Sequence, residues 1–78
     1  MNKEYRYIAK RAIYEALTGG RKLSQMDCRE FEVEDMRTPI SHMKDDFTRE
    51  GYALNSQWIH TPKGRRIKEY WLTRANNN

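Results

Sequence analysis

The apolar residues change their spacing at Gly51-Tyr52, and this change restricts the fold more than any other feature of the sequence. Before Gly51 the apolar residues recur every three or four positions, as they do on one face of a helix. After it they alternate with polar residues, which is typical of a strand with one buried face. The sequence therefore predicts an α+β domain with its helices first and its main strands last.

A first helix is predicted from Tyr5 to Leu17, ended by Gly19 and Gly20. Its apolar face holds Tyr5, Ile8, Ala9, Ala12, Ile13, Ala16 and Leu17. Tyr7 and Tyr14 lie two turns apart on the opposite, basic face. These tyrosines either are partly covered by a neighbouring segment or form a binding stripe, and the second reading makes the Tyr7/Tyr14 face a candidate homodimer contact.

A second, brief helix is predicted between Ser24 and Phe31. Ser24 and Asp27 have the spacing of a capping box. In this motif the Ser24 side chain accepts from the amide of Asp27, and the Asp27 side chain accepts from the amide of Ser24. Leu23 precedes it, in an expected short strand. Cys28 and Phe31 should face the core, and Cys28 has no basic partner at a catalytic spacing, so we interpret it as a small buried hydrophobe.

A third helix is predicted from Thr38 to Gly51. Thr38 is a good N-cap, and Pro39 suits the first helical position because its missing amide has no partner there. Ile40, Met43 and Phe47 recur at helical spacing and should be buried.

A β-hairpin completes the chain. Thr61-Pro62-Lys63-Gly64 has the composition of a tight turn between two alternating runs. The predicted order is a helix, a short strand, two helices and a hairpin, which is the element order of a winged helix. We assign this domain to residues 1–74 and expect a disordered tail at 75–78. The residues expected to be mostly buried are Ile8, Ala12, Ile13, Cys28, Phe31, Ile40, Met43, Phe47, Leu54, Trp58, Tyr70 and Leu72.

The run GYALNSQWIHTPKGRRIKEYWL resembles the carboxy-terminal half of small helix-turn-helix proteins of bacteriophages and prophages. The features that carry the resemblance are Gly51-Tyr52, Trp58, Pro62/Gly64, Arg65-Arg66 and Tyr70/Leu72. The resemblance implies a winged-helix fold and DNA binding in the cytoplasm of a bacterial host, as a transcriptional regulator or an excisionase-like accessory factor. The chain departs from the family in the third helix, which is usually rich in Arg: Met43 and Lys44 stand in that stretch, followed by Asp45 and Asp46.

Two residue sets are candidates for contacting double-stranded DNA. If the third helix enters the major groove, Ser41, His42, Lys44 and Asp45 would reach bases, with Arg37 and Thr38 near a phosphate. At the hairpin tip, or wing, the candidates are Lys63, Arg65, Arg66 and Lys68. Two readings of the wing stay open: it contacts phosphates or the minor groove, or its cations only keep the protein soluble and protect an edge strand.

Charge is segregated along the chain. Residues 1–22 carry six cations and two acids, residues 23–50 four cations and eight acids, and residues 51–78 five cations and one acid. The acids of the middle segment either point away from DNA, accept from a cytosine amino group, or bind a basic protein. The last reading gives the alternative function, a protein-interaction module acting through Glu32, Glu34, Asp35, Asp45 and Asp46.

Other classes of function find no support in the sequence. There is no phosphate-binding glycine loop, no nucleophile with a matched base and no metal-ligand spacing, so we expect no enzyme activity, no cofactor and no metal site. The single cysteine precludes an internal disulfide. No apolar run approaches the roughly 20 residues of a membrane span, and we expect a cytoplasmic protein.

Overall fold

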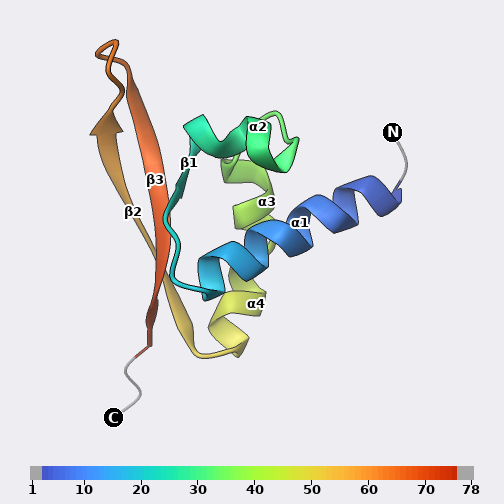
Figure 1. Ribbon diagram of the computed structural model, residues 1–78. Coiled ribbons are helices and arrows are strands. Elements are labelled where there is room, and N and C mark those ends of the chain that lie inside the picture. The colour runs from blue at the N-terminus through green and yellow to red at the C-terminus, as the bar shows by residue number, and fades with distance from the viewer. Residues whose placement is uncertain (1–2, 76–78) are drawn as a thin grey trace.

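The computed structural model describes the backbone of residues 3–75 and the side chains of residues 8–75 (Figure 1). Within this range the protein is an α+β domain with four α-helices and an antiparallel sheet of three strands. In chain order the elements are α1 (Lys3–Thr18), β1 (Leu23–Ser24), the short 3-10 helix η1 (Gln25–Asp27), α2 (Cys28–Phe31), α3 (Arg37–His42), α4 (Lys44–Arg49), β2 (Tyr52–His60) and β3 (Arg66–Arg74).

The sheet has the order β1-β3-β2. Strands β2 and β3 pair without interruption from Tyr52 opposite Arg74 to His60 opposite Arg66, and β1 adds only two residues, with Leu23 opposite Tyr70. The predicted hairpin and the predicted short strand at Leu23 are therefore confirmed.

The turn between β2 and β3 has the geometry that its sequence predicts. The amide of Gly64 donates to the carbonyl of Thr61 at 2.8 Å, which closes a β-turn. Gly64 has a φ of 85°, a left-handed conformation that glycine adopts without a steric penalty. At the other end of the hairpin, the amide of Ala75 donates to the carbonyl of Gly51. The rest of the predicted tail, residues 76–78, lies outside the described residues.

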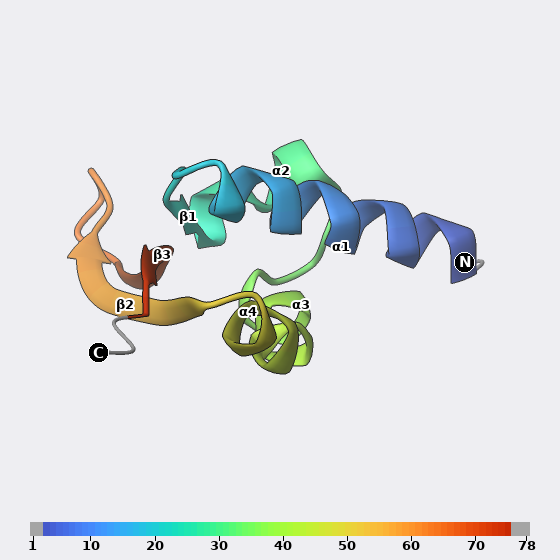
Figure 2. The ribbon, with the colours of Figure 1, turned by 90° about the horizontal axis from the view of Figure 1, so that it is seen from below.

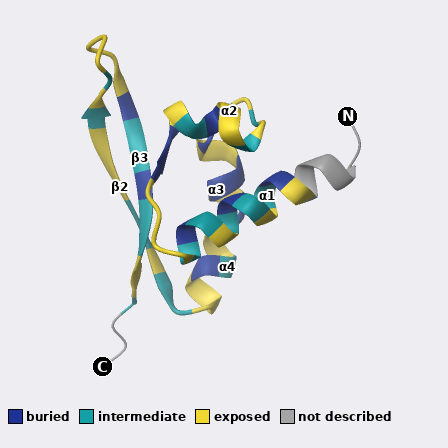
Figure 3. Ribbon diagram, viewed as in Figure 1, coloured by how far each residue is buried: buried dark blue, intermediate teal, exposed yellow. Residues whose placement is uncertain are grey.

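The helices pack against one end of the hairpin, and its tip projects beyond them (Figures 1 and 2). The core lies between the helices and the sheet, where the dark-blue segments face one another in Figure 3. Its largest fully buried side chains are Phe47, Ile13, Leu17, Leu23, Met36 and Ile40. Of the residues predicted to be buried, Ile13, Cys28, Ile40, Met43, Phe47 and Tyr70 are confirmed, whereas Ala12, Phe31, Leu54 and Leu72 are half-buried.

The predicted burial of Ile8 is wrong, since this side chain is 65% exposed. The buried stripe of α1 runs through Ala9, Ile13 and Leu17, which are spaced four residues apart. The amino-terminal part of α1 projects past the other elements in Figures 1 and 2, so Ile8 has no core beside it.

Tyr14 does not lie on an outward-facing stripe. It is half-buried, and its ring stacks on Phe47 of α4. The side chain of Tyr7 lies outside the described residues. Of the two readings of these tyrosines, partial burial therefore describes Tyr14, and the proposed homodimer face loses one of its two residues.

The prediction for Trp58 is also wrong, because Trp58 is 56% exposed. It points to the same face of the hairpin as Leu54, which packs against the core. Trp58 stands four residues nearer the tip, and its exposure shows that no other element covers this face of the hairpin there. The alternation thus predicted the correct face, but not the point along that face at which the core ends.

The third predicted helix is divided at Met43 into α3 and α4. Its predicted start is wrong: Thr38 is the second helical residue and Pro39 the third, and Met36 occupies the N-cap without a side-chain hydrogen bond. Asp35 supplies the missing acceptor, since its Oδ1 accepts from the amide of Thr38 at 2.7 Å. Pro39 remains compatible with this position because the first amides of a helix have no intrahelical acceptor.

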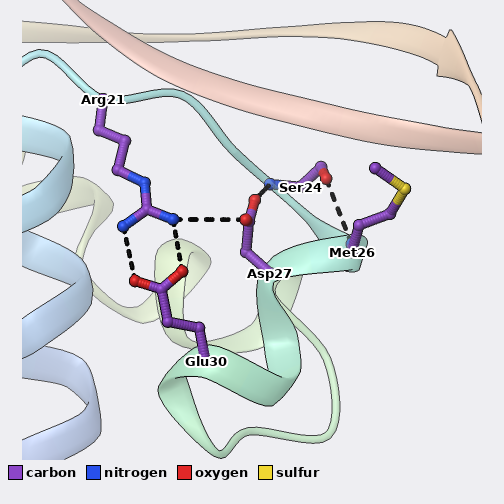
Figure 4. Close-up of polar contacts among 5 residues, drawn as sticks. All are labelled: Arg21, Ser24, Met26, Asp27 and Glu30. Carbon is purple, nitrogen blue, oxygen red and sulfur yellow. Dashed lines mark hydrogen bonds and ion pairs between the residues drawn. The ribbon is translucent and has the colours of Figure 1, made fainter.

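The predicted capping box at Ser24 and Asp27 is present. A second network, shown in Figure 4, joins it to the turn that follows α1. The guanidinium of Arg21 donates to both carboxylate oxygens of Glu30, and its Nη2 also lies 3.4 Å from Asp27 Oδ1. These hydrogen bonds lower the pKa of Glu30. Arg21 therefore links the end of α1 to the start of the η1–α2 segment.

Candidate functional site

The predicted helix set lies on the surface. Pro39 and Ile40 of α3 and Met43 after it pack into the core, which turns the other positions of α3 to solvent. Arg37, Thr38, Ser41 and His42 of α3 are exposed, as are Lys44 and Asp45 of α4. The break at Met43 means that Lys44 and Asp45 belong to the first turn of α4 and not to α3.

The amino-terminal end of α3 is held by side chains that sequence reasoning did not identify. Gln25 of η1 accepts from the amide of Met36 at 3.1 Å through Oε1 and donates to the carbonyl of Glu34 at 3.2 Å through Nε2. Met36, which was not among the residues predicted to be buried, is fully buried beside this link. Gln25 therefore fixes the connection that leads into α3, and its position just after the Ser24 cap is the only sequence signal that marks it.

Asp35 and Asp46, which are among the acids that cast doubt on DNA binding, are engaged by other groups of the chain. Asp35 accepts from Thr38 at the start of α3, and this hydrogen bond lowers the pKa of its carboxyl group. Asp46 pairs with Arg49 at 3.2 Å. Asp45 and Glu34 are exposed, and their carboxylates have no recorded partner within residues 8–75.

The predicted wing residues also lie on the surface. Lys63, Arg65 and Arg66 are exposed and Lys68 is half-buried. None of them makes an ion pair with any residue that the structure describes. Glu69, the nearest acid in the sequence, accepts from Gln57 at 2.9 Å. The positive charge of the tip is therefore not neutralised by the described part of the chain.

Trp58 belongs to the wing, although sequence reasoning assigned it to the core. The guanidinium carbon of Arg66 lies 4.6 Å from the centroid of the Trp58 ring, and Lys68 Nζ lies 5.3 Å from it. Lys68 is directly opposite Trp58 in the hairpin, and Arg66 is its diagonal neighbour on the same face. The sequence did contain a signal for this contact, since the predicted hairpin places a cation, Lys68, across from Trp58. These cation–π contacts hold two wing cations on one aromatic ring.

The structure does not bring the two predicted sets together in one cluster. Figure 1 shows the wing tip projecting beyond the body, while α3 and α4 lie within it. In Figure 2 the tip curves toward the side on which α1 lies, and α3 and α4 lie on the other side. A single ligand that contacts both sets must therefore extend over much of the molecule, whose longest dimension is 42 Å.

The described residues contain no group of three or more His, Cys, Asp or Glu side chains placed to hold a metal ion. Cys28 is buried, which raises the pKa of its thiol. Within residues 3–75, no helix has the length and apolar character needed to cross a membrane. No protein-family model matches the chain, and comparisons with curated proteins and with solved structures give no significant match.

Proposed function

We propose that this protein is a winged-helix DNA-binding protein. The observation that carries the proposal is the wing: Lys63, Arg65 and Arg66 project on a tight hairpin and have no carboxylate partner among the described residues. A folded chain gains nothing in stability from holding three like charges on one short turn, whereas a phosphate backbone would neutralise them.

The wing would act on the phosphate backbone or in the minor groove. Trp58 contributes by holding Arg66 and Lys68 against its ring, which limits the conformations of both side chains before DNA is bound. Less side-chain freedom would then be lost on binding.

The exposed face of α3 would act in the major groove. Arg37 and Thr38 lie at the start of this helix, where phosphate contacts are common, and Ser41 and His42 have side chains that can bond to base edges. The molecule measures 42 Å in its longest dimension and one turn of B-DNA rises about 34 Å, so α3 and the wing would contact one duplex at separate places on its surface. In this proposal Asp35 and Asp46 do not oppose binding strongly because each is engaged within the chain.

The element order of helix, strand, helices and hairpin supports the winged-helix assignment, and so does the resemblance of the hairpin segment to phage and prophage helix-turn-helix proteins. On this basis we propose a role in phage or prophage gene control or recombination, in the cytoplasm of a bacterial host, as a transcriptional regulator or an excisionase-like accessory factor.

Fluorescence anisotropy with a labelled mixed-sequence duplex tests the proposal. We expect saturable binding at about 50 mM salt, with an affinity that falls steeply as salt is added. A variant with Lys63→Glu and Arg65→Glu should bind far more weakly than one with Lys10→Glu and Arg11→Glu, which changes the net charge equally on α1. Absence of duplex binding at low salt would overturn the proposal, as would equal weakening in the two variants.

A second candidate function rests on Glu34 and Asp45, whose exposed carboxylates have no recorded partner within residues 8–75. With Glu32, Asp35 and Asp46 they would form an acidic surface for a basic host or phage protein. Replacing Glu34 and Asp45 with Gln and Asn separates the two functions, because the substitution should weaken docking to a basic protein and leave or improve DNA binding.

A further inference from the structure

The outer edge of β2 presents a row of unpaired backbone groups. The amide of Thr61 donates to the carbonyl of Arg65, and the amide of Ala75 donates to that of Gly51. Because β2 and β3 pair in one continuous register, these two bonds show which residues of β2 bond to β3. The odd-numbered residues do so, and the even-numbered residues direct their amides and carbonyls outward. The outward groups belong to Tyr52, where β2 begins, and to Leu54, Ser56, Trp58 and His60.

No described residue bonds to these outward groups. The sheet order places β2 at an edge, and Figure 1 shows no other segment beyond its upper half. The exposed side chains of Ser56, Gln57, Trp58 and His60 lie in that half. The lower half begins beside α4 (Figure 1). The accessible part of the edge therefore lies past the first residues of β2, from Leu54 toward the wing.

This edge has none of the features by which proteins usually prevent strands from pairing between molecules. Lys residues, prolines, β-bulges and short strand length are the common protections. Strand β2 is nine residues long, contains no Lys, Arg, Asp, Glu or Pro, and pairs with β3 without a bulge. The absence of Lys, Arg, Asp and Glu contrasts with a chain in which 33% of the residues are charged.

We propose that two copies of this chain pair through the outer edges of β2, in antiparallel orientation about a two-fold axis near Gln57. A strand paired antiparallel with its own copy is self-complementary, because the same outward donors and acceptors face each other on both sides. In this register Ser56 of one copy lies opposite Trp58 of the other, and Leu54 lies opposite His60.

Charge determines the orientation in which the second copy pairs with the edge. Antiparallel pairing places the two cationic tips at opposite ends of the joined sheet, and β2 itself brings no pair of like formal charges together. A parallel arrangement would bring Lys63, Arg65 and Arg66 of the two copies side by side, where they would repel one another. The joined sheet would contain three strands from each copy.

Amide hydrogen exchange on the DNA-free protein tests the pairing residue by residue. As the protein concentration rises, the amides of Leu54, Ser56, Trp58 and His60 should exchange at least about tenfold more slowly. The amides of Asn55, Gln57 and Ile59 should be protected at every concentration, since they already bond to β3. A protein that stays monomeric at millimolar concentration would overturn the proposal. A dimer whose even-numbered amides exchange as in the monomer would also overturn it.

Sedimentation equilibrium of two variants provides a matched control. Ser56→Pro removes an outward amide without removing a bond to β3, and proline is tolerated at such edge positions. We expect this variant to raise the dimer dissociation constant at least about tenfold. Ser56→Ala retains the amide and should dimerise like the parent. Equal dimerisation of the Pro and Ala variants would contradict the proposed edge, and if the Pro variant does not fold, the exchange pattern of the parent decides.

Discussion

The rings of Tyr14 and Phe47 lie parallel, with 5.3 Å between their centroids and 9° between their planes. This stack joins α1 to α4 across the core, so two helices far apart in the sequence are held by one aromatic pair. Partial burial raises the pKa of the Tyr14 hydroxyl, as expected for a phenol turned toward apolar neighbours. Phe47 is fully buried and is the largest side chain in the centre of the core.

Replacing Phe47 with Ala should lower the free energy of unfolding by about 3–5 kcal/mol, because it leaves a cavity and removes the partner of Tyr14. In a domain of this size such a loss would unfold much of the population at room temperature. Urea unfolding followed by circular dichroism measures the effect. Tyr14→Phe keeps the stack and should change stability by less than about 0.5 kcal/mol. A cost for Phe47→Ala below about 1 kcal/mol would contradict the central role of this residue.

Much of the fold could be predicted because its signals are local. Gly19 and Gly20 follow α1, Ser24 and Asp27 form the predicted capping box, and Gly64 adopts the left-handed conformation that its turn requires. In each case a few adjacent residues determine the backbone, so neighbouring elements are not needed to recognise the pattern.

The errors arise where burial depends on how far an element extends. Ile8 and Trp58 both have apolar side chains on regular elements, but each stands where no other element covers its side chain. Periodicity assigns a residue to a face and carries no information on which elements cover that face. For the same reason, the exposure of the helix set was predictable, whereas the separation of α3 from the wing was not.

Asp35 should make the stability of the protein depend on pH through its hydrogen bond with the Thr38 amide. Because folding lowers the pKa of this carboxyl, the carboxylate stabilises the fold above its unfolded pKa of about 3.9 and loses that contribution as pH falls through its lower folded value. Asp35→Ala should therefore cost about 1 kcal/mol at neutral pH and progressively less below about pH 4. Urea titrations of both proteins at a series of pH values measure this difference.

Glu34→Ala is the control for that series. Glu34 is adjacent to Asp35 and exposed, but its carboxylate makes no recorded hydrogen bond within residues 8–75. Its removal should have little effect at any pH. If the cost of Asp35→Ala stayed constant down to pH 2, the carboxylate would not be the group that caps α3.

His42→Ala tests whether α3 reads DNA sequence. If Ser41, His42 and Lys44 face the major groove, this change should alter base preference at one or two positions and leave non-specific affinity nearly intact. Selection from a random duplex library, followed by sequencing, measures the preference. His60→Ala, on the hairpin, should leave the selected motif unchanged. The same motif from the parent and the His42 variant would remove His42 from base recognition.

Removing the wing cations distinguishes the two explanations for their presence, which are DNA contact and solubility. Each phosphate contact contributes about −0.9 to the slope of log affinity against log salt concentration. A variant with Lys63, Arg65 and Arg66 all replaced by Ala should fold normally, because these side chains are exposed and the turn geometry depends on Gly64. It should bind duplex DNA far more weakly, with a slope shallower by roughly two to three units.

The matched control replaces Lys10, Arg11 and Arg74, which removes the same charge from α1 and from the end of β3 farthest from the tip. The slope of this control should stay closer to that of the parent. If affinity and slope of the wing variant equal those of the parent, the cations only protect an edge and keep the protein soluble, and the acidic surface around Glu34 and Asp45 becomes the better candidate for the binding site.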